Sequence, residues 1–173
     1  MATTNEPVTF DNAIALSQSL LSQAHTGKLS DAEIASQIAE LVKTENGARG
    51  FFVTFLTSDI SLADNPSDAV IQALRSSPEV VAKLLVKNLA MSTAQALFHR
   101  RRQAEEMAQG SQRVQARTAR LIDLVDLPEV KEEARKLINS ATTSGGSYTA
   151  FLERWNYDTE QRQLICSALQ KVV

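Results

Sequence analysis

Hydrophobic side chains recur along most of this chain at the three- and four-residue spacing of an α-helix. Ile34, Ile38 and Leu41 follow this spacing, and a longer apolar run extends from Val80 to Phe98. Strand-like patterning is almost absent. The pattern predicts an all-α protein, a single-domain bundle of six to eight helices around a long central helix that starts at Pro78.

Start and stop signals place the helices along the chain. Ser30 and Glu33 have capping-box spacing, and Ser77 followed by Pro78 is a strong helix start. Gly27 predicts the end of the first helix, and Asn46-Gly47 the end of the second. We expect helices at about residues 11–25, 30–45, 50–57, 67–75, 78–109, 111–125, 128–140 and 158–173, with a loop at 58–66 and a flexible linker at 142–147.

Two segments leave more than one interpretation open. The segment from Gly50 to Thr57 has the composition of a strand. A lone strand cannot pair its backbone groups, so a short buried helix is the favoured interpretation. An unbroken helix from Pro78 to Val125 would measure about 72 Å, against about 40 Å for a domain of this size. We therefore predict a break near Gly110.

The domain organisation follows from these elements. Residues 1–9 are predicted to be a flexible N-terminal tail, and residues 10–173 a single all-helical domain. Glycines and serines before the last predicted helix leave open whether residues 144–173 form a mobile C-terminal helical hairpin.

Composition narrows the class of protein. The net charge is −2, and the single cysteine, Cys166, excludes an internal disulfide. The first residues have no secretory-signal pattern, and no apolar run is long and uncharged enough to span a membrane. These features predict a cytoplasmic protein that does not bind a membrane.

Arginines supply the only local concentration of charge. Residues 99–120 contain six arginines and two acids, and arginine suits planar contact with carboxylate or phosphate. Arg102 aligns with the later arginines only if the helix continues through Gly110. The alternative interpretation is a solvated helix face. The candidate anion or partner surface consists of His99, Arg100, Arg101, Arg102, Arg113, Arg117 and Arg120.

A second candidate surface is aromatic. Four of the nine aromatic residues fall within ten positions, at Tyr148, Phe151, Trp155 and Tyr157. Three of them have one-face helical spacing, so they form either a partner patch or a clamp that docks the C-terminal hairpin. The clamp is the favoured interpretation.

The sequence contains no catalytic, metal or nucleotide signature. His25, His99 and Cys166 are scattered and lack metal-site spacing. We therefore expect no metal and no cofactor, and no enzyme activity is predicted. The leading hypothesis is a non-enzymatic helical protein-interaction module that forms a homodimer or binds a protein partner with an acidic surface. The alternatives are binding of a polyanion or phosphorylated ligand, with nucleic acid disfavoured, and a helical bundle that binds a small molecule or cofactor.

Overall fold

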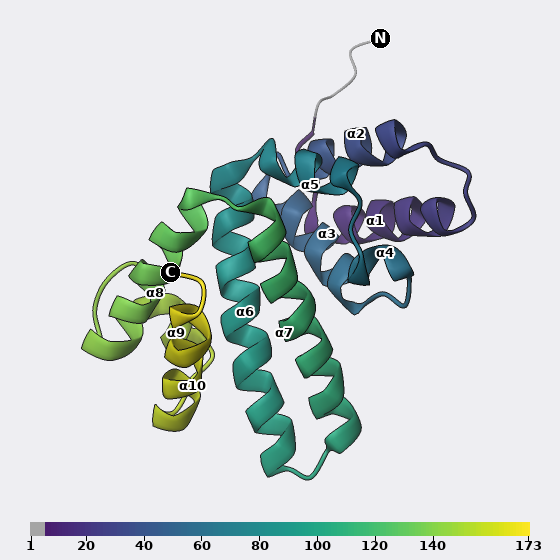
Figure 1. Cartoon of the computed structure of the whole chain (residues 1–173). Coiled ribbons are helices and arrows are strands. Elements are labelled where there is room, and N and C mark those ends of the chain that lie inside the picture. The colour runs from purple at the N-terminus through teal and green to yellow at the C-terminus, as the bar shows by residue number, and fades with distance from the viewer. Residues whose placement is uncertain (1–5) are drawn as a thin grey trace. The chain divides into compact units, whose positions relative to one another are not determined.

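The computed structural model describes residues 6–173, which fold into helices joined by short loops (Figure 1). Within these residues there are ten helices and no strand, so the all-α prediction is confirmed. The long helix α6 begins at Pro78 as predicted. The helices are α1 (Phe10–His25), α2 (Asp31–Leu41), α3 (Glu45–Thr57), α4 (Ser61–Asp64), α5 (Asp68–Arg75), α6 (Pro78–Arg101), α7 (Glu105–Val125), α8 (Pro128–Thr143), α9 (Thr149–Arg154) and α10 (Thr159–Gln170).

The chain divides into two compact units, one ending at Val81 and the other beginning at Ala82. The single domain at residues 10–173 stays a prediction. The predicted tail lies partly outside the described residues. Its last residue, Thr9, caps α1 by accepting a hydrogen bond from the backbone N–H of Asn12 at 3.2 Å.

The N-terminal unit has a core built on α3. Phe51, Phe52 and Phe55 are fully buried, and the Phe51 and Phe55 rings stack with their centroids 5.1 Å apart. The segment Gly50–Thr57 lies within α3, so the favoured interpretation of a buried helix is confirmed. Gly50 lets α3 lie against α1, because a Cβ at this position would come within 2.4 Å of the Ala13 Cβ.

Helix caps in the N-terminal unit follow the sequence, with one exception. The Ser30–Glu33 capping box forms, with both of its hydrogen bonds present. The prediction that Asn46-Gly47 ends the second helix is wrong, because both residues lie in the first turn of α3. A Cβ on Gly47 would lie 2.0 Å from the Leu41 carbonyl oxygen, so this glycine permits a close backbone approach.

The predicted loop at 58–66 contains one helical turn, α4. Together with α9 (Thr149–Arg154), which was also not among the eight predicted helices, this raises the number of helices in the described residues to ten. In the C-terminal unit, α8 extends to Thr143, into the predicted flexible linker. The second predicted capping box is present, because Asp158 and Gln161 exchange hydrogen bonds at the start of α10.

The predicted break at Gly110 is wrong. Helix α7 runs through Gly110 without interruption, and the chain turns at residues 102–104 instead. Backbone hydrogen bonds from Ala104 to the His99 carbonyl and from Gln103 to the Arg100 carbonyl form a Schellman end. Gln103 takes the left-handed conformation, φ 56°, that glycine usually supplies. Figure 1 shows α6 and α7 running in opposite directions on either side of this turn.

Candidate functional site

The turn between α6 and α7 exposes a compact set of large and charged side chains. Each lies within one helical turn of the loop at residues 102–104, and each is exposed to solvent. Phe98 is 40% exposed and Met107 is 59% exposed, which is high for large apolar side chains. We call this set the hairpin tip: Phe98, Arg100, Arg102, Glu105, Glu106 and Met107.

An aromatic ring and a guanidinium stack at the hairpin tip. The Cζ of Arg102 lies 4.6 Å from the centroid of the Phe98 ring, within cation–π distance. The His99 ring packs edge-on against Phe98, with centroids 5.4 Å apart. This contact favours the orientation in which the Arg102 side chain lies over the Phe98 ring.

Arg101, in contrast, is paired within the chain. Its Nη1 donates to Asp158 Oδ2 at 2.5 Å, and its Nη2 donates to Glu160 Oε2 at 2.5 Å. The hydrogen bond from Arg101 lowers the pKa of the Asp158 carboxyl, and the two carboxylates raise the pKa of Arg101. Arg101 therefore joins α6 to the start of α10.

These contacts change the net charge around the three adjacent arginines, Arg100, Arg101 and Arg102. The three arginines are accompanied by four carboxylates, Glu105 and Glu106 on α7 and Asp158 and Glu160 at the start of α10. Carboxylates therefore outnumber arginines by one here, whereas the sequence suggested a cationic surface.

Arg113, Arg117 and Arg120 lie on α7, so they do not share a helix with the arginines at the end of α6. The turn at residues 102–104 separates Arg102 from all three, so the alignment that depended on one continuous helix does not occur, although α7 does run through Gly110. Arg113 and Arg120 are exposed, whereas Arg117 is only 5% exposed.

The aromatic group is buried at two of its four positions, Tyr148 and Tyr157. Tyr148 is buried, and its hydroxyl donates to Glu133 Oε2 at 2.6 Å. Burial alone would raise the pKa of Glu133, but the hydrogen bonds from Tyr148 and Lys136 outweigh burial and lower this pKa. The Tyr148 backbone N–H also donates to Ser140 Oγ, at 3.0 Å. These bonds attach the start of α9 to α8.

The other aromatic residues divide between the interior and the surface. The Phe151 ring lies 6.2 Å from both Tyr148 and Tyr157, and burial raises the pKa of Tyr157 to about 12. Trp155 is 41% exposed. Helix α9 spans only Thr149–Arg154, so the spacing that predicted one helical face from Tyr148 to Trp155 does not describe a single helix.

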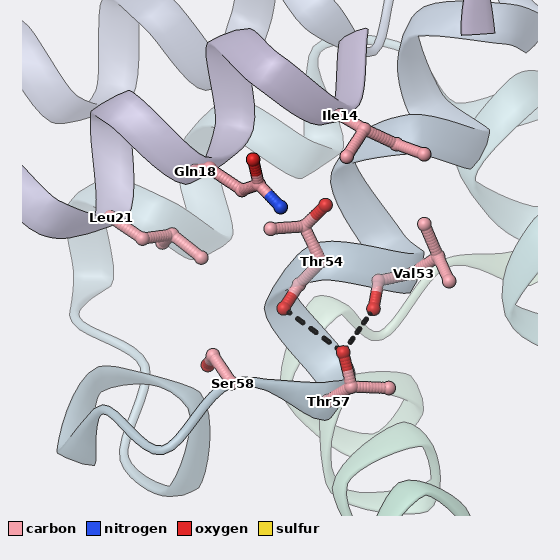
Figure 2. A pocket seen from close by; sticks show the side chains of 7 residues that line it. All are labelled: Ile14, Gln18, Leu21, Val53, Thr54, Thr57 and Ser58. Atoms are coloured by element: carbon pink, nitrogen blue, oxygen red, sulfur yellow. Dashed lines mark hydrogen bonds between the residues drawn. The ribbon is translucent and has the colours of Figure 1, made fainter. Parts of the chain in front are cut away.

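A shallow groove of about 420 Å³ lies between α1 and α3 in the N-terminal unit (Figure 2). No lining side chain is charged. The hydroxyls of Thr54, Thr57 and Ser58 each donate to a backbone carbonyl of the preceding turn, at 2.6 to 2.8 Å. The hydrogens of these three hydroxyls are therefore already used within the chain. The lining consists of Ile14, Gln18, Leu21, Val53, Thr54, Thr57 and Ser58.

The remaining candidates from the sequence do not gather into a reactive site. Burial raises the pKa of the Cys166 thiol, the opposite of what a nucleophile requires. His25 is exposed in the last turn of α1. Residues 6–173 hold no cluster of three or more histidine, cysteine or acidic side chains that could bind a metal. No helix of the described chain is long and apolar enough to cross a membrane.

The sequence did not predict that Met107, Glu105 and Glu106 belong to the same turn region as Phe98. The turn at residues 102–104 contains no glycine, proline or asparagine that would have marked it. The only sequence signal was the pair Glu105-Glu106, since acids favour the first turn of a helix.

Comparison with protein families finds a match over most of the chain. The model of the family described as "Uncharacterised conserved protein UCP020893" matches residues 9–172. No curated protein and no solved structure matches the chain.

Proposed function

The chain belongs to the family of uncharacterised conserved proteins UCP020893, and we propose that it is a non-enzymatic helical interaction module whose contact surface is the hairpin tip. The observation that carries this proposal is the stacked pair of Phe98 and Arg102 at an exposed position. Arginine is enriched in binding hot spots, and phenylalanine and methionine are enriched in protein interfaces. A cytoplasmic location and a partner that is either a second copy or an acidic protein belong to the same proposal.

Two further arguments support the hairpin tip over the aromatic group as the contact surface. Tyr148 and Tyr157 are buried, so neither can reach a partner without unfolding part of the C-terminal segment. At the hairpin tip, Phe98 and Met107 are already exposed. A surface that is ordered and exposed before binding pays a smaller entropic cost on association.

Photo-crosslinking tests this function on the full chain in its native cells. A photoreactive residue replaces Phe98 or Met107, and a matched control replaces Trp155, which is equally exposed outside the tip. We expect one product of defined mass from the two tip positions, lost in Arg102→Glu, and none from position 155. If the tip positions give no product, the function is wrong.

Binding of a small molecule is a second candidate, favoured by the groove between α1 and α3. Its aliphatic walls and uncharged lining suit a neutral, largely apolar molecule. Native mass spectrometry of the purified chain should then show a bound mass that disappears in Val53→Trp, which fills the groove. A chain that carries no bound mass under native purification would contradict this candidate.

Polyanion binding gains little from the geometry. Asp158 and Glu160 contact Arg101, and Glu105 and Glu106 follow Arg102 closely in the chain, so all four carboxylates would repel phosphate groups. A polyanion would have to displace the contacts of Arg101 with Asp158 and Glu160 in order to use all three cations.

A further inference from the structure

We infer that the partner of the hairpin tip is the hairpin tip of a second copy of this chain, related to the first by a two-fold axis. Arg100 and Arg102 of one copy then face Glu105 and Glu106 of the other. This inference rests on the proposed function and names the partner for the same surface.

The charges at the hairpin tip are balanced once Arg101 is set aside. Arg101 is already paired with α10, so two cations and two anions remain at the tip. All four side chains are exposed, and among residues 6–173 none of the four forms an ion pair within the chain. Their charges are therefore available to a partner.

The placement of these charges suits a symmetric pair. The two arginines lie at the end of α6, and the two glutamates lie in the first turn of α7. A two-fold interface uses the same surface on both copies, so each surface must be complementary to itself. In a two-fold pair, the arginines of each copy can meet the glutamates of the other, and the same contact is then made twice.

The apolar side chains supply affinity, and the charges supply orientation. Exposed ion pairs contribute little to affinity, but they select one docking register over others. Phe98 and Met107 provide the exposed apolar area at the tip. A hairpin tip is smaller than a standard interface, so we expect a dissociation constant of ~10–100 µM.

A second copy fits this surface better than an acidic protein. An acidic surface would meet Glu105 and Glu106 as well as the arginines, and like charges in contact oppose binding. A partner that carries both signs in the same order has no such penalty, and the chain itself carries that order.

Charge reversal tests the inference with two double variants of the full chain, Arg100→Glu/Arg102→Glu and Glu105→Arg/Glu106→Arg. Sedimentation equilibrium from ~1 to ~500 µM spans the expected dissociation constant. We expect the wild type to dimerise, each variant alone to associate at least ~10-fold more weakly, and an equimolar mixture to recover the wild-type affinity. Circular dichroism confirms that both variants are folded.

Two results would overturn the inference. One is a wild-type chain that stays monomeric at every concentration. The other is a mixture of folded variants that associates no better than either variant alone. Neither result touches the proposed function, because crosslinks from positions 98 and 107 to a different protein would preserve the tip as a contact surface. A tip that forms no crosslink at all removes the proposed function.

Discussion

The hairpin tip and the aromatic group of the C-terminal segment combine the same residue types, cations over aromatic rings, in opposite surroundings. Arg102 lies over Phe98 at a solvent-exposed turn. Lys87 lies over Tyr148, with its Nζ 6.0 Å from the ring centroid, and Tyr148 is buried with its hydroxyl bonded to Glu133. Residue type therefore does not separate an interaction surface from a core. Burial and the partners of the polar atoms do.

Truncating an aromatic side chain should have very different effects on stability in the two regions. Tyr148→Ala removes a buried ring and leaves Glu133 without its phenol donor, so we expect a loss of ~3–5 kcal/mol in the free energy of unfolding. Phe98→Ala should change it by no more than ~0.5 kcal/mol. Chemical denaturation of both variants measures this difference, and equal losses would show that Phe98 belongs to the core.

Removing only the hydroxyl of Tyr148 tests whether its hydrogen bond to Glu133 stabilises the fold. Tyr148→Phe leaves the buried Glu133 carboxylate with one donor fewer and should cost ~1–3 kcal/mol at neutral pH. The folded-state pKa of Glu133 is lowered, so its contribution is present above the unfolded pKa of about 4.3 and is lost as the pH falls through the folded value.

The stability difference between wild type and Tyr148→Phe should therefore shrink below about pH 4. Urea unfolding at a series of pH values measures it. A difference that stays constant from neutral to acid pH would contradict a charged Glu133 as the acceptor.

The sequence predicted those parts of the fold that depend on local chemistry. The capping boxes at Ser30 and Asp158 and the start at Pro78 were correct, because each signal acts within a few residues. The turn after α6 was missed because Gln103 takes a conformation that usually marks glycine, and the surrounding contacts determine that choice. The pairing of Arg101 with α10 spans more than fifty positions, and no local pattern encodes it.

A substitution at Gly110 tests whether α7 is continuous at this position. It lies inside α7, and a Cβ there would meet no atom within 4 Å. Gly110→Ala should therefore raise the free energy of unfolding by ~0.5–1 kcal/mol, because alanine is the better helix former. Thermal unfolding measures this gain. A break at Gly110 in solution would reverse its sign.

Two neighbouring arginines provide a smaller and more local test. Arg101→Met removes the contact with Asp158 and Glu160, so backbone amides of α10 should exchange hydrogen faster than in the wild type at low salt. The difference should decrease in ~1 M salt, which screens exposed charges. Arg102→Met is the matched control and should leave exchange in α10 unchanged. Equal effects of both substitutions would contradict the separate roles of the two arginines.

The most direct test of whether the hairpin tip joins two copies is the mass of the chain in solution. Sedimentation equilibrium measures it on the wild type and on Phe98→Ser/Met107→Ser. Trp155→Ser is the control, since Trp155 is exposed outside the tip. We predict a dimer at ~300 µM for the wild type and for the control, and a folded monomer for the tip variant. A tip variant that dimerises like the wild type would contradict the account.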